Sequence, residues 1–137
     1  MKQEFSNKWI GSKQIRKQRK YRENSPLHIK HKLMAASLSK ALKEKYKKNS
    51  FPVRKGDTVK VLSGKFADKK GKIEKVLLKR LKVTVESLQI GKKDGTKISV
   101  YFPTSKLQIE EMNLDDKKRL DALNRKVKEK NHAPEKK

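Results

Sequence analysis

The stretch from Lys55 to Ile73 reads KGDTVKVLSGKFADKKGKI and combines two different patterns. Val59 and Val61 alternate with polar residues, which is the two-residue period of a half-buried β-strand. From Gly64 to Gly71 this alternation stops, and a charged loop bounded by glycines takes its place. We therefore expect a strand of a small β-domain that leads directly into a basic loop.

Four lysines give this loop its charge, and their grouping predicts contact with the phosphates of RNA. Contacts of this kind fix the register of a protein on RNA without reading its sequence. The two glycines permit backbone angles that side chains forbid, and they would let a phosphate backbone approach closely. For Phe66 two roles are open, either an anchor folded back onto the β-domain or an exposed ring that stacks on a base. The lysines are Lys65, Lys69, Lys70 and Lys72.

The charge of the whole chain points to a polyanionic partner. Lys and Arg number 39 against 15 Asp and Glu in 137 residues, which gives a net charge of +24. Nucleic acid is the natural partner, because each cation brought to a phosphate releases condensed counterions. A membrane surface is disfavoured, since no segment joins a strong apolar face to a basic one and no apolar run reaches the roughly 20 residues of a bilayer span.

Other chemistry finds little support in the sequence. The chain has no cysteine, and its first residues lack the apolar region of a secretory signal, so a cytoplasmic location is expected. His28 and His31 are three residues apart but are interleaved with lysines, which would repel a metal cation. No nucleophile, phosphate-binding or dinucleotide motif is present, so we expect no enzyme, no cofactor, no metal and no small-molecule substrate.

Changes of pattern divide the chain into three parts, of which the first is the most basic. Residues 1–50 hold 15 basic and 3 acidic residues, hence +12; residues 51–110 hold 15 and 6, hence +9; residues 111–137 hold 9 and 6, hence +3. With few apolar positions of its own, the first part is expected to be a basic arm whose order depends on a partner.

The middle part predicts the fold class, which is mainly β. Five short strands with short turns and no helix between them favour a small, closed or nearly closed antiparallel barrel of the SH3 type. Asp94-Gly95 is a tight-hairpin signal between the third and fourth strands. The predicted strands are 57–62, 72–78, 81–87, 97–102 and 106–109.

Short helices are expected on both sides of this barrel. In the arm, Ser25-Pro26 and Ser39 are typical N-terminal signals, and they predict helices up to about Met34 and over residues 40–48. Leu38, Leu42 and Tyr46 recur at helical spacing and are expected to pack against the barrel. After Asp115 and Asp116 a C-terminal helix should place Leu120, Leu123 and Val127 on one face, before a disordered tail from His132.

The arm also carries a compact basic cluster, RKQRKYR, from Arg16 to Arg22. Its cations suit phosphates, and either Tyr21 or Trp9 could stack on a base or a sugar. A merely solvated run of charge is the simpler alternative.

With these residues in view, the chain resembles a known family. The Gly-Asp turn, alternating strand, glycine, basic loop, second glycine and β-branched residue of the 55–73 stretch resemble a KOW element. The flanking KQIRKQRKYRENSPLHIKHKLMAASLSKALKEKY and FPVRKGDTVKV, with the DGT turn, FPTSKLQI and LDDKKR further on, resemble the archaeal and eukaryotic branch of the universal large-subunit ribosomal protein twenty-four.

The resemblance implies a structural protein that binds large-subunit ribosomal RNA in its 5′ domain beside neighbouring ribosomal proteins. It further implies a role early in subunit assembly and a place near the exit of the peptide tunnel. The implied RNA contacts are Arg16, Lys17, Arg19, Lys20, His28, Lys30, His31, Lys32, Arg54, Lys55 and the loop from Lys65 to Lys72 with Phe66. Two rivals remain, a KOW factor that acts with RNA polymerase and a basic chromatin protein.

Overall fold

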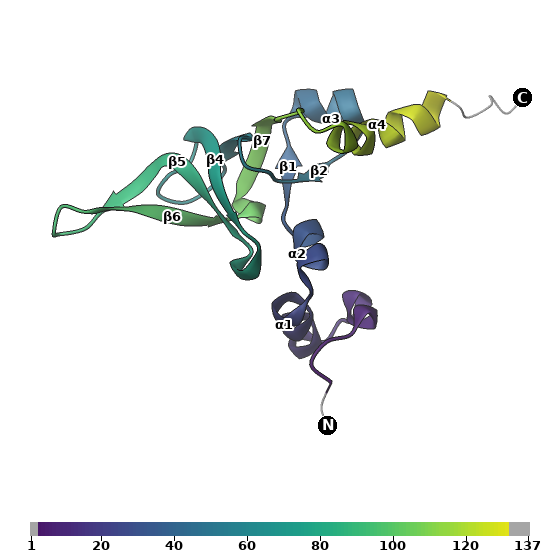
Figure 1. Cartoon of the computed structure of the whole chain (residues 1–137), viewed down its shortest axis with the longest axis horizontal. Helices are drawn as coiled ribbons and strands as arrows, with labels where there is room; N and C mark the ends of the chain where they lie inside the picture. The colour runs from purple at the N-terminus through teal and green to yellow at the C-terminus, as the bar shows by residue number, and fades with distance from the viewer. Residues whose placement is uncertain (1–2, 132–137) are drawn as a thin grey trace, which may run out of the picture.

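The computed structural model describes residues 3–131, and within these it describes the side chains of residues 3–125. One seven-stranded sheet carries the fold, with helices at both ends of the chain (Figure 1). The strands are β1 (Ala35–Leu38), β2 (Ser50–Pro52), β3 (Thr58–Val61), β4 (Lys70–Leu77), β5 (Lys82–Gly91), β6 (Lys97–Pro103) and β7 (Leu107–Glu111). The helices are α1 (Ile15–Asn24), α2 (Leu27–Leu33), α3 (Lys40–Tyr46) and α4 (Lys117–Asn131), with single turns η1 (Asn7–Gly11), η2 (Leu78–Arg80) and η3 (Thr104–Lys106).

The order of strands confirms a mainly β domain but corrects its architecture. The order is β2-β1-β7-β3-β4-β5-β6, and β2 and β6 are the two outer strands, so the sheet is open. β1 runs parallel to β7, whereas all other neighbours are antiparallel. All five predicted strands are present, but in place of the expected closed or nearly closed antiparallel barrel they belong to a larger, mixed sheet that is not closed.

Of the two strands that the sequence pattern did not indicate, β1 comes from the predicted arm and β2 lies at the boundary between the arm and the middle part. Met34, Ala36 and Leu38 are buried and alternate with half-buried residues, so the segment after α2 is a strand. Leu38 therefore belongs to β1 and not to the helix predicted from its spacing, while Tyr46 is buried on α3 as expected. Backbone pairing with β2 on one side and β7 on the other holds β1 in the sheet.

The core is one cluster of buried apolar side chains, most of which come from the strands of the sheet. Val59 and Val61 are fully buried, which confirms the alternation that first indicated β3. Leu123 of α4 is also fully buried in this cluster, and Leu42 packs against it. The side chain of Val127 and the predicted tail from His132 lie outside the described residues.

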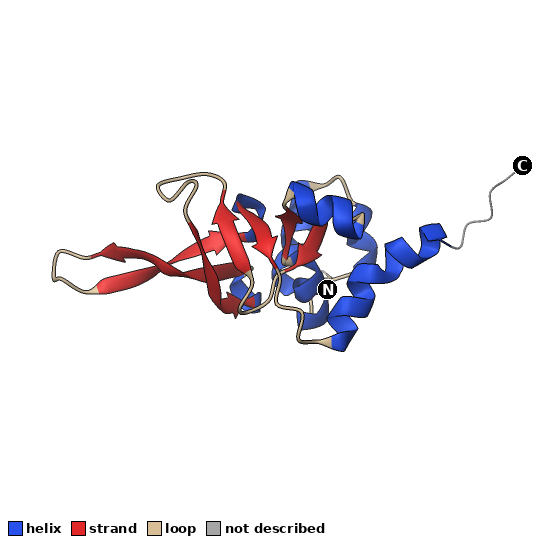
Figure 2. Ribbon diagram, turned by 90° about the horizontal axis from the view of Figure 1, so that it is seen from above, coloured by secondary structure: helices blue, strands red, loops and turns tan. Residues whose placement is uncertain are grey.

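A long β5–β6 hairpin projects from one end of the sheet, at the left of Figure 2. Gly95 adopts φ +83 at its tip, and the amide of Lys92 donates to the carbonyl of Thr96 at 2.8 Å, which confirms the predicted turn. None of the described helices is long and apolar enough to cross a membrane.

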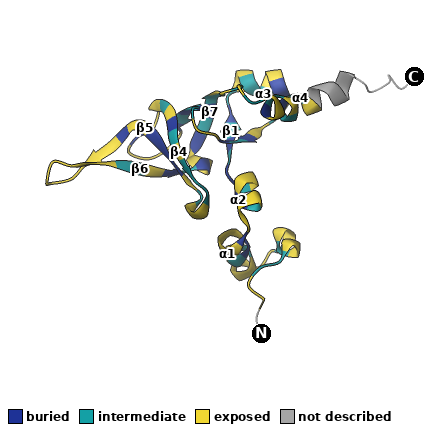
Figure 3. Cartoon of the chain, in the orientation of Figure 1, coloured by how far each residue is buried: buried dark blue, intermediate teal, exposed yellow. Residues whose placement is uncertain are grey.

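The N-terminal arm leaves the sheet as a column of short helices, mostly exposed in Figure 3. Its first residues have structure that the sequence did not reveal. The Gln18 side chain donates to the carbonyls of Trp9 (2.9 Å) and Ser12 (2.8 Å), and the rings of Phe5 and Tyr21 stack at 5.6 Å. The proline at the predicted helix start is the residue before α2 and not its first residue.

A buried ion pair joins the turn before β3 to the C-terminal helix. The Arg119 guanidinium donates to both carboxylate oxygens of Asp57 at 2.7 Å, and the two side chains are 4% and 0% exposed. The backbone amides of Arg54 and Asn113 donate to the same carboxylate at 2.8 and 3.0 Å. Asp57 is therefore more than the turn residue that its place after Gly56 suggests.

The second glycine of the basic loop has a structural role that differs from the predicted one. Gly64 has φ +103 and open space around it, so it serves the turn itself. Gly71 lies in β4 and needs no unusual backbone angle, but an added Cβ would lie 2.7 Å from Cγ1 of Val85 and 2.9 Å from the carbonyl oxygen of Glu86. Its lack of a side chain lets β4 and β5 approach each other.

We expect Asp57→Asn to lower the free energy of unfolding by about 3–5 kcal/mol, because it leaves the buried Arg119 charge uncompensated. Urea unfolding measures the loss. Asp68→Asn is the matched control, since it neutralises a carboxylate whose ion pair is exposed. Equal losses from the two variants would show that the buried pair is not special.

Gly71→Ala should lower the free energy of unfolding by roughly 1–3 kcal/mol, because the added methyl group meets the backbone of β5. Gly91→Ala is the control, since it lies in the same sheet with nothing within 4 Å of the added Cβ. Thermal unfolding followed by circular dichroism compares the two variants. A Gly71→Ala protein as stable as the control would contradict the close approach of the strands.

Candidate nucleic-acid interface

The loop between β3 and β4 is held in one shape by backbone hydrogen bonds at its base. The amide of Asp68 donates to the carbonyl of Val61 at 2.8 Å, and the amide of Val61 donates to the carbonyl of Lys69 at 2.9 Å. Gly64 and Asp68 both adopt positive φ, which folds the chain back on itself. The basic loop is therefore an ordered turn.

Phe66 fixes the loop to the core, which is the first of the two roles considered for it. Its ring is 9% exposed and meets the ring of Phe102 edge-on, with centroids 6.0 Å apart. The Nζ of Lys69 lies 5.5 Å from the centre of the Phe66 ring. In this conformation the ring is not offered for base stacking, so Phe66 acts by placing the lysines around it.

Two ion pairs determine which cations of the loop are free for phosphate. Nζ of Lys60 lies 2.8 Å from Asp68, and Nζ of Lys70 lies 2.7 Å from Glu110. The hydrogen bond from Lys60 lowers the pKa of Asp68, and the same bond raises the pKa of Lys60. Asp68 thus neutralises a neighbouring strand lysine, and the exposed lysines outside these pairs are Lys65, Lys69 and Lys72.

The predicted contacts in the first helix form an exposed basic face. Arg16, Lys17 and Arg19 are exposed on α1 and Lys20 is half-buried. Tyr21 is 5% exposed in its stack with Phe5, so this ring is not available to a base. Within the cluster RKQRKYR, only the cations therefore remain as predicted RNA contacts.

The predicted contacts on α2 face different ways. His28, His31 and Lys32 are exposed, whereas Lys30 is only 8% exposed. His28 lines a hollow beside η1 and Tyr21, and His31 lines others beside Arg54. The two histidines therefore do not share a site, and among the described residues no group of three possible metal ligands comes together.

Arg54 and Lys55 lie in the exposed turn that follows β2, close to α2. Together with His31 they line a hollow of about 310 Å³. The guanidinium of Arg54 lies 2.7 Å from Asp116, and this hydrogen bond lowers the pKa of that carboxyl group. The fold thus brings the predicted contacts on α2 next to those of the 54–55 turn. None of the hollows formed by described residues contains either group together with residues of the β3–β4 loop.

One group of cations was missed by the sequence reasoning. Lys79 and Arg80 form the η2 turn, which the pattern presented only as a connection between two strands. With Arg19 and Arg22 of α1 they line a hollow of about 470 Å³. The pair of adjacent basic residues at a strand connection was the available signal.

The sequence matches a known protein family and a relative over most of its length. The sequence model of a family described as the eukaryotic ribosomal proteins L26 and their archaeal L24 counterparts matches residues 12–126. The protein from Methanosphaera stadtmanae called large ribosomal subunit protein uL24 is 47% identical over 116 residues, which cover 85% of this chain and 99% of that relative. The family is one of structural proteins of the ribosome and not of enzymes. The chain therefore belongs to the family of eukaryotic L26 and archaeal L24 ribosomal proteins.

Proposed function

We propose that this protein binds ribosomal RNA of the large subunit directly and helps to fold and fix its 5′ domain. Family membership carries the proposal, and the net charge of +24 of the whole chain supports it. Neutralising the phosphates of converging RNA strands removes the repulsion that keeps them apart. From the same family relationship we propose action early in subunit assembly, a place near the exit of the peptide tunnel, neighbouring ribosomal proteins as partners, and a cytoplasmic location.

The segment 55–73 is the KOW element in this proposal, as part of a domain related to SH3-like barrels. Support comes from the turn at Gly56, the alternating strand β3 and the ordered basic loop before β4. The resemblance also assigns RNA contacts to α1, α2, the 54–55 turn and this loop. Of these residues we assign a packing role to Phe66 and a phosphate role to the exposed cations.

The rival functions fit the observations less well. A factor that works with RNA polymerase, or a chromatin protein, would share the basic loop. Neither accounts for a family match that extends from residue 12 in the arm to residue 126 in the last helix.

The loop is suited to RNA because its shape exists before binding. Phe66 and the Lys60–Asp68 pair order the segment in the free protein, so less conformational entropy is lost when phosphates bind. The pair is fully formed above the ordinary carboxyl pKa. It weakens as the pH falls through the lowered pKa of Asp68.

Binding of a transcript of the large-subunit 5′ domain should weaken steeply with salt, and removing the free lysines of the loop should flatten the dependence. Replacing Lys65, Lys69 and Lys72 with Ala should reduce the slope of log K against log salt by roughly 2.1–2.7, at roughly 0.7–0.9 per phosphate contact. The charge-matched control replaces Lys40, Lys117 and Lys118, which are exposed on α3 and α4. No binding by the wild-type protein would refute the function, and equal slopes for both variants would refute the role of the loop.

Lys60→Ala should raise the pKa of the Asp68 carboxyl group toward its ordinary value, because the hydrogen bond from Lys60 is the largest cause of the lowering. Titration of the side-chain carboxyl by NMR measures the shift. Lys75→Ala is the control, because Lys75 pairs with Glu74 and not with Asp68. An unchanged Asp68 titration in Lys60→Ala would mean that the pair does not form in solution.

A further inference from the structure

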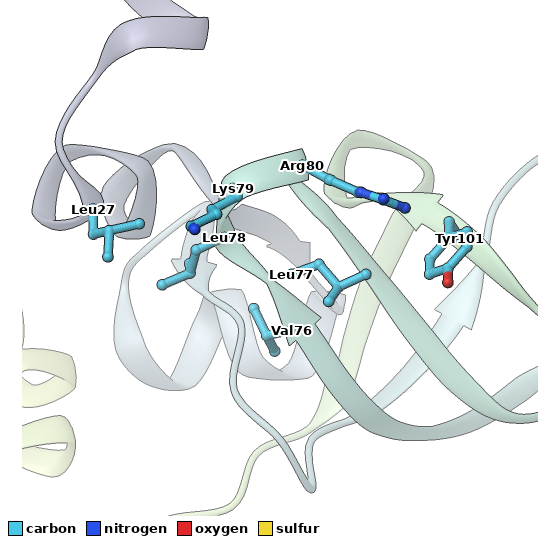
Figure 4. Close-up of a pocket in the computed structure, with 7 residues that line it drawn as sticks. All are labelled: Leu27, Val76, Leu77, Leu78, Lys79, Arg80 and Tyr101. Carbon is cyan, nitrogen blue, oxygen red and sulfur yellow. The ribbon is translucent and has the colours of Figure 1, made fainter.

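A groove runs between the arm and the sheet, at the place where α2 packs against η2. Its first part is a hollow of about 570 Å³ with a largely apolar floor. Figure 4 shows Leu27 of α2 on one side and Tyr101 of β6 on the other, with the η2 turn between them. The other residues that line it are Val76, Leu77, Leu78, Lys79 and Arg80.

The groove continues past η2 to the basic face of α1. Lys79 and Arg80 line both the apolar hollow and the neighbouring hollow of about 470 Å³, where Arg19 and Arg22 lie opposite them. In the part of the chain whose side chains are described, none of the ion pairs involves these four cations. Glu23 is the one acidic residue on this rim. Four positive side chains against one negative make the rim complementary to a polyanion.

The floor of the hollow is an apolar surface suited to an unpaired base and not to a duplex. Leu27 is 53% exposed and Tyr101 is 44% exposed, so two large apolar side chains face the hollow from opposite walls without a covering group in the described structure. A paired helix presents phosphates and sugars and keeps its bases stacked inside. An unpaired base, in contrast, has a flat face that stacks on an aromatic ring whatever its identity.

The local backbone supports the exposure of the two η2 cations. Leu81 ends η2 with φ 52, a left-handed conformation that is rare for a bulky residue, and its side chain packs against the core. This sharp reversal returns the chain into β5 and leaves Lys79 and Arg80 exposed at the outside of the turn. In Figure 4 the Arg80 side chain extends from η2 toward Tyr101.

We propose that this groove binds a single-stranded segment of RNA, with one unstacked base in the apolar hollow against Tyr101 and the adjoining phosphates on Lys79, Arg80, Arg19 and Arg22. The proposal rests on the proposed RNA-binding function and adds to it the class of RNA that this site takes. An acidic peptide with an apolar anchor is the other occupant that the chemistry allows. RNA is favoured because the groove continues the cationic face of α1.

The test compares two RNA probes on the full-length protein. One is a ten-nucleotide single strand and the other is a blunt duplex that contains the same strand. Tyr101→Leu should weaken binding of the single strand by about 5–150-fold, as expected for loss of one base–aromatic stack, and should change duplex binding by less than about 2-fold. Leu27→Asp, made on the opposite wall at an exposed position, should show the same selectivity.

The charge variants give an independent readout. Replacing Lys79 and Arg80 with Ala should reduce the salt slope for the single strand by about 1.4, at roughly 0.7 per contact. Replacing Lys92 and Lys93, two exposed lysines near the hairpin tip, is the charge-matched control and should leave the selectivity for single strands unchanged.

Each outcome decides a different question. If Tyr101→Leu and Leu27→Asp leave single-strand binding unchanged, or weaken both probes equally, the groove does not take a base, although binding of the ribosomal transcript would still support the proposed function. A second outcome is that Tyr101→Leu weakens binding of an acidic leucine-containing peptide but leaves RNA binding unchanged. The groove would then bind a protein partner, and the inference would be overturned. If the wild-type protein binds the transcript and both probes without salt dependence, the proposed function itself fails.

Discussion

The fold depends on the buried pair of Asp57 and Arg119, because it joins four segments that belong to two regions of the chain, and the two charged residues are 62 positions apart. The carboxylate accepts hydrogen bonds from two backbone amides and from both ends of the guanidinium. Arg119 also donates to the carbonyls of Asn113 and Pro52, so the end of β2, the turn before β3, the chain after β7 and α4 meet at one point. Burying two charges is unfavourable unless every polar atom finds a partner. This requirement admits few alternative arrangements of the four segments, and in this way the pair positions the turn from which β3 and the basic loop start.

The sequence predicts those elements that are determined by residues close to one another in the chain. Alternation of valines with polar residues indicates β3, and Asp94-Gly95 indicates the hairpin turn, because each feature follows from its immediate neighbours. β1 and β2 were missed because they have only four and three residues and are strands mainly through their pairing with other segments. The open sheet was missed for the same reason, because it depends on pairing between distant segments. β1 pairs with β7 and β2 pairs with β1, so both are added at the edge of β7 that a five-stranded barrel would use for closure. Arg119 could not be recognised as a partner of Asp57 across 62 residues of sequence.

For the candidate interface, the sequence predicts where the charge lies better than it predicts which side chains are available. Arg16, Lys17, Lys65 and Lys69 are exposed, as solvation of a charge requires. The aromatic residues depend on packing that distant segments provide. Phe66 meets Phe102 and Tyr21 meets Phe5, so two rings that could have stacked on bases are turned inward. Tyr101 has the opposite outcome, because it faces outward from β6 opposite an exposed leucine of the arm.

In the proposed function, the arm and the loop would bring charge to RNA under different physical conditions. The loop is ordered by Phe66 and by the backbone of the sheet, so its lysines are placed before RNA arrives. The arm is ordered by its own contacts, such as those of Gln18, and reaches the sheet where α2 packs on η2. That joint is also the place where the cations of α1 and η2 face each other, and without a polyanion between them they repel. RNA bound in the groove would convert this repulsion into attraction to a shared phosphate chain. The same contact would then hold the arm against the sheet, which couples the position of the arm to the presence of RNA.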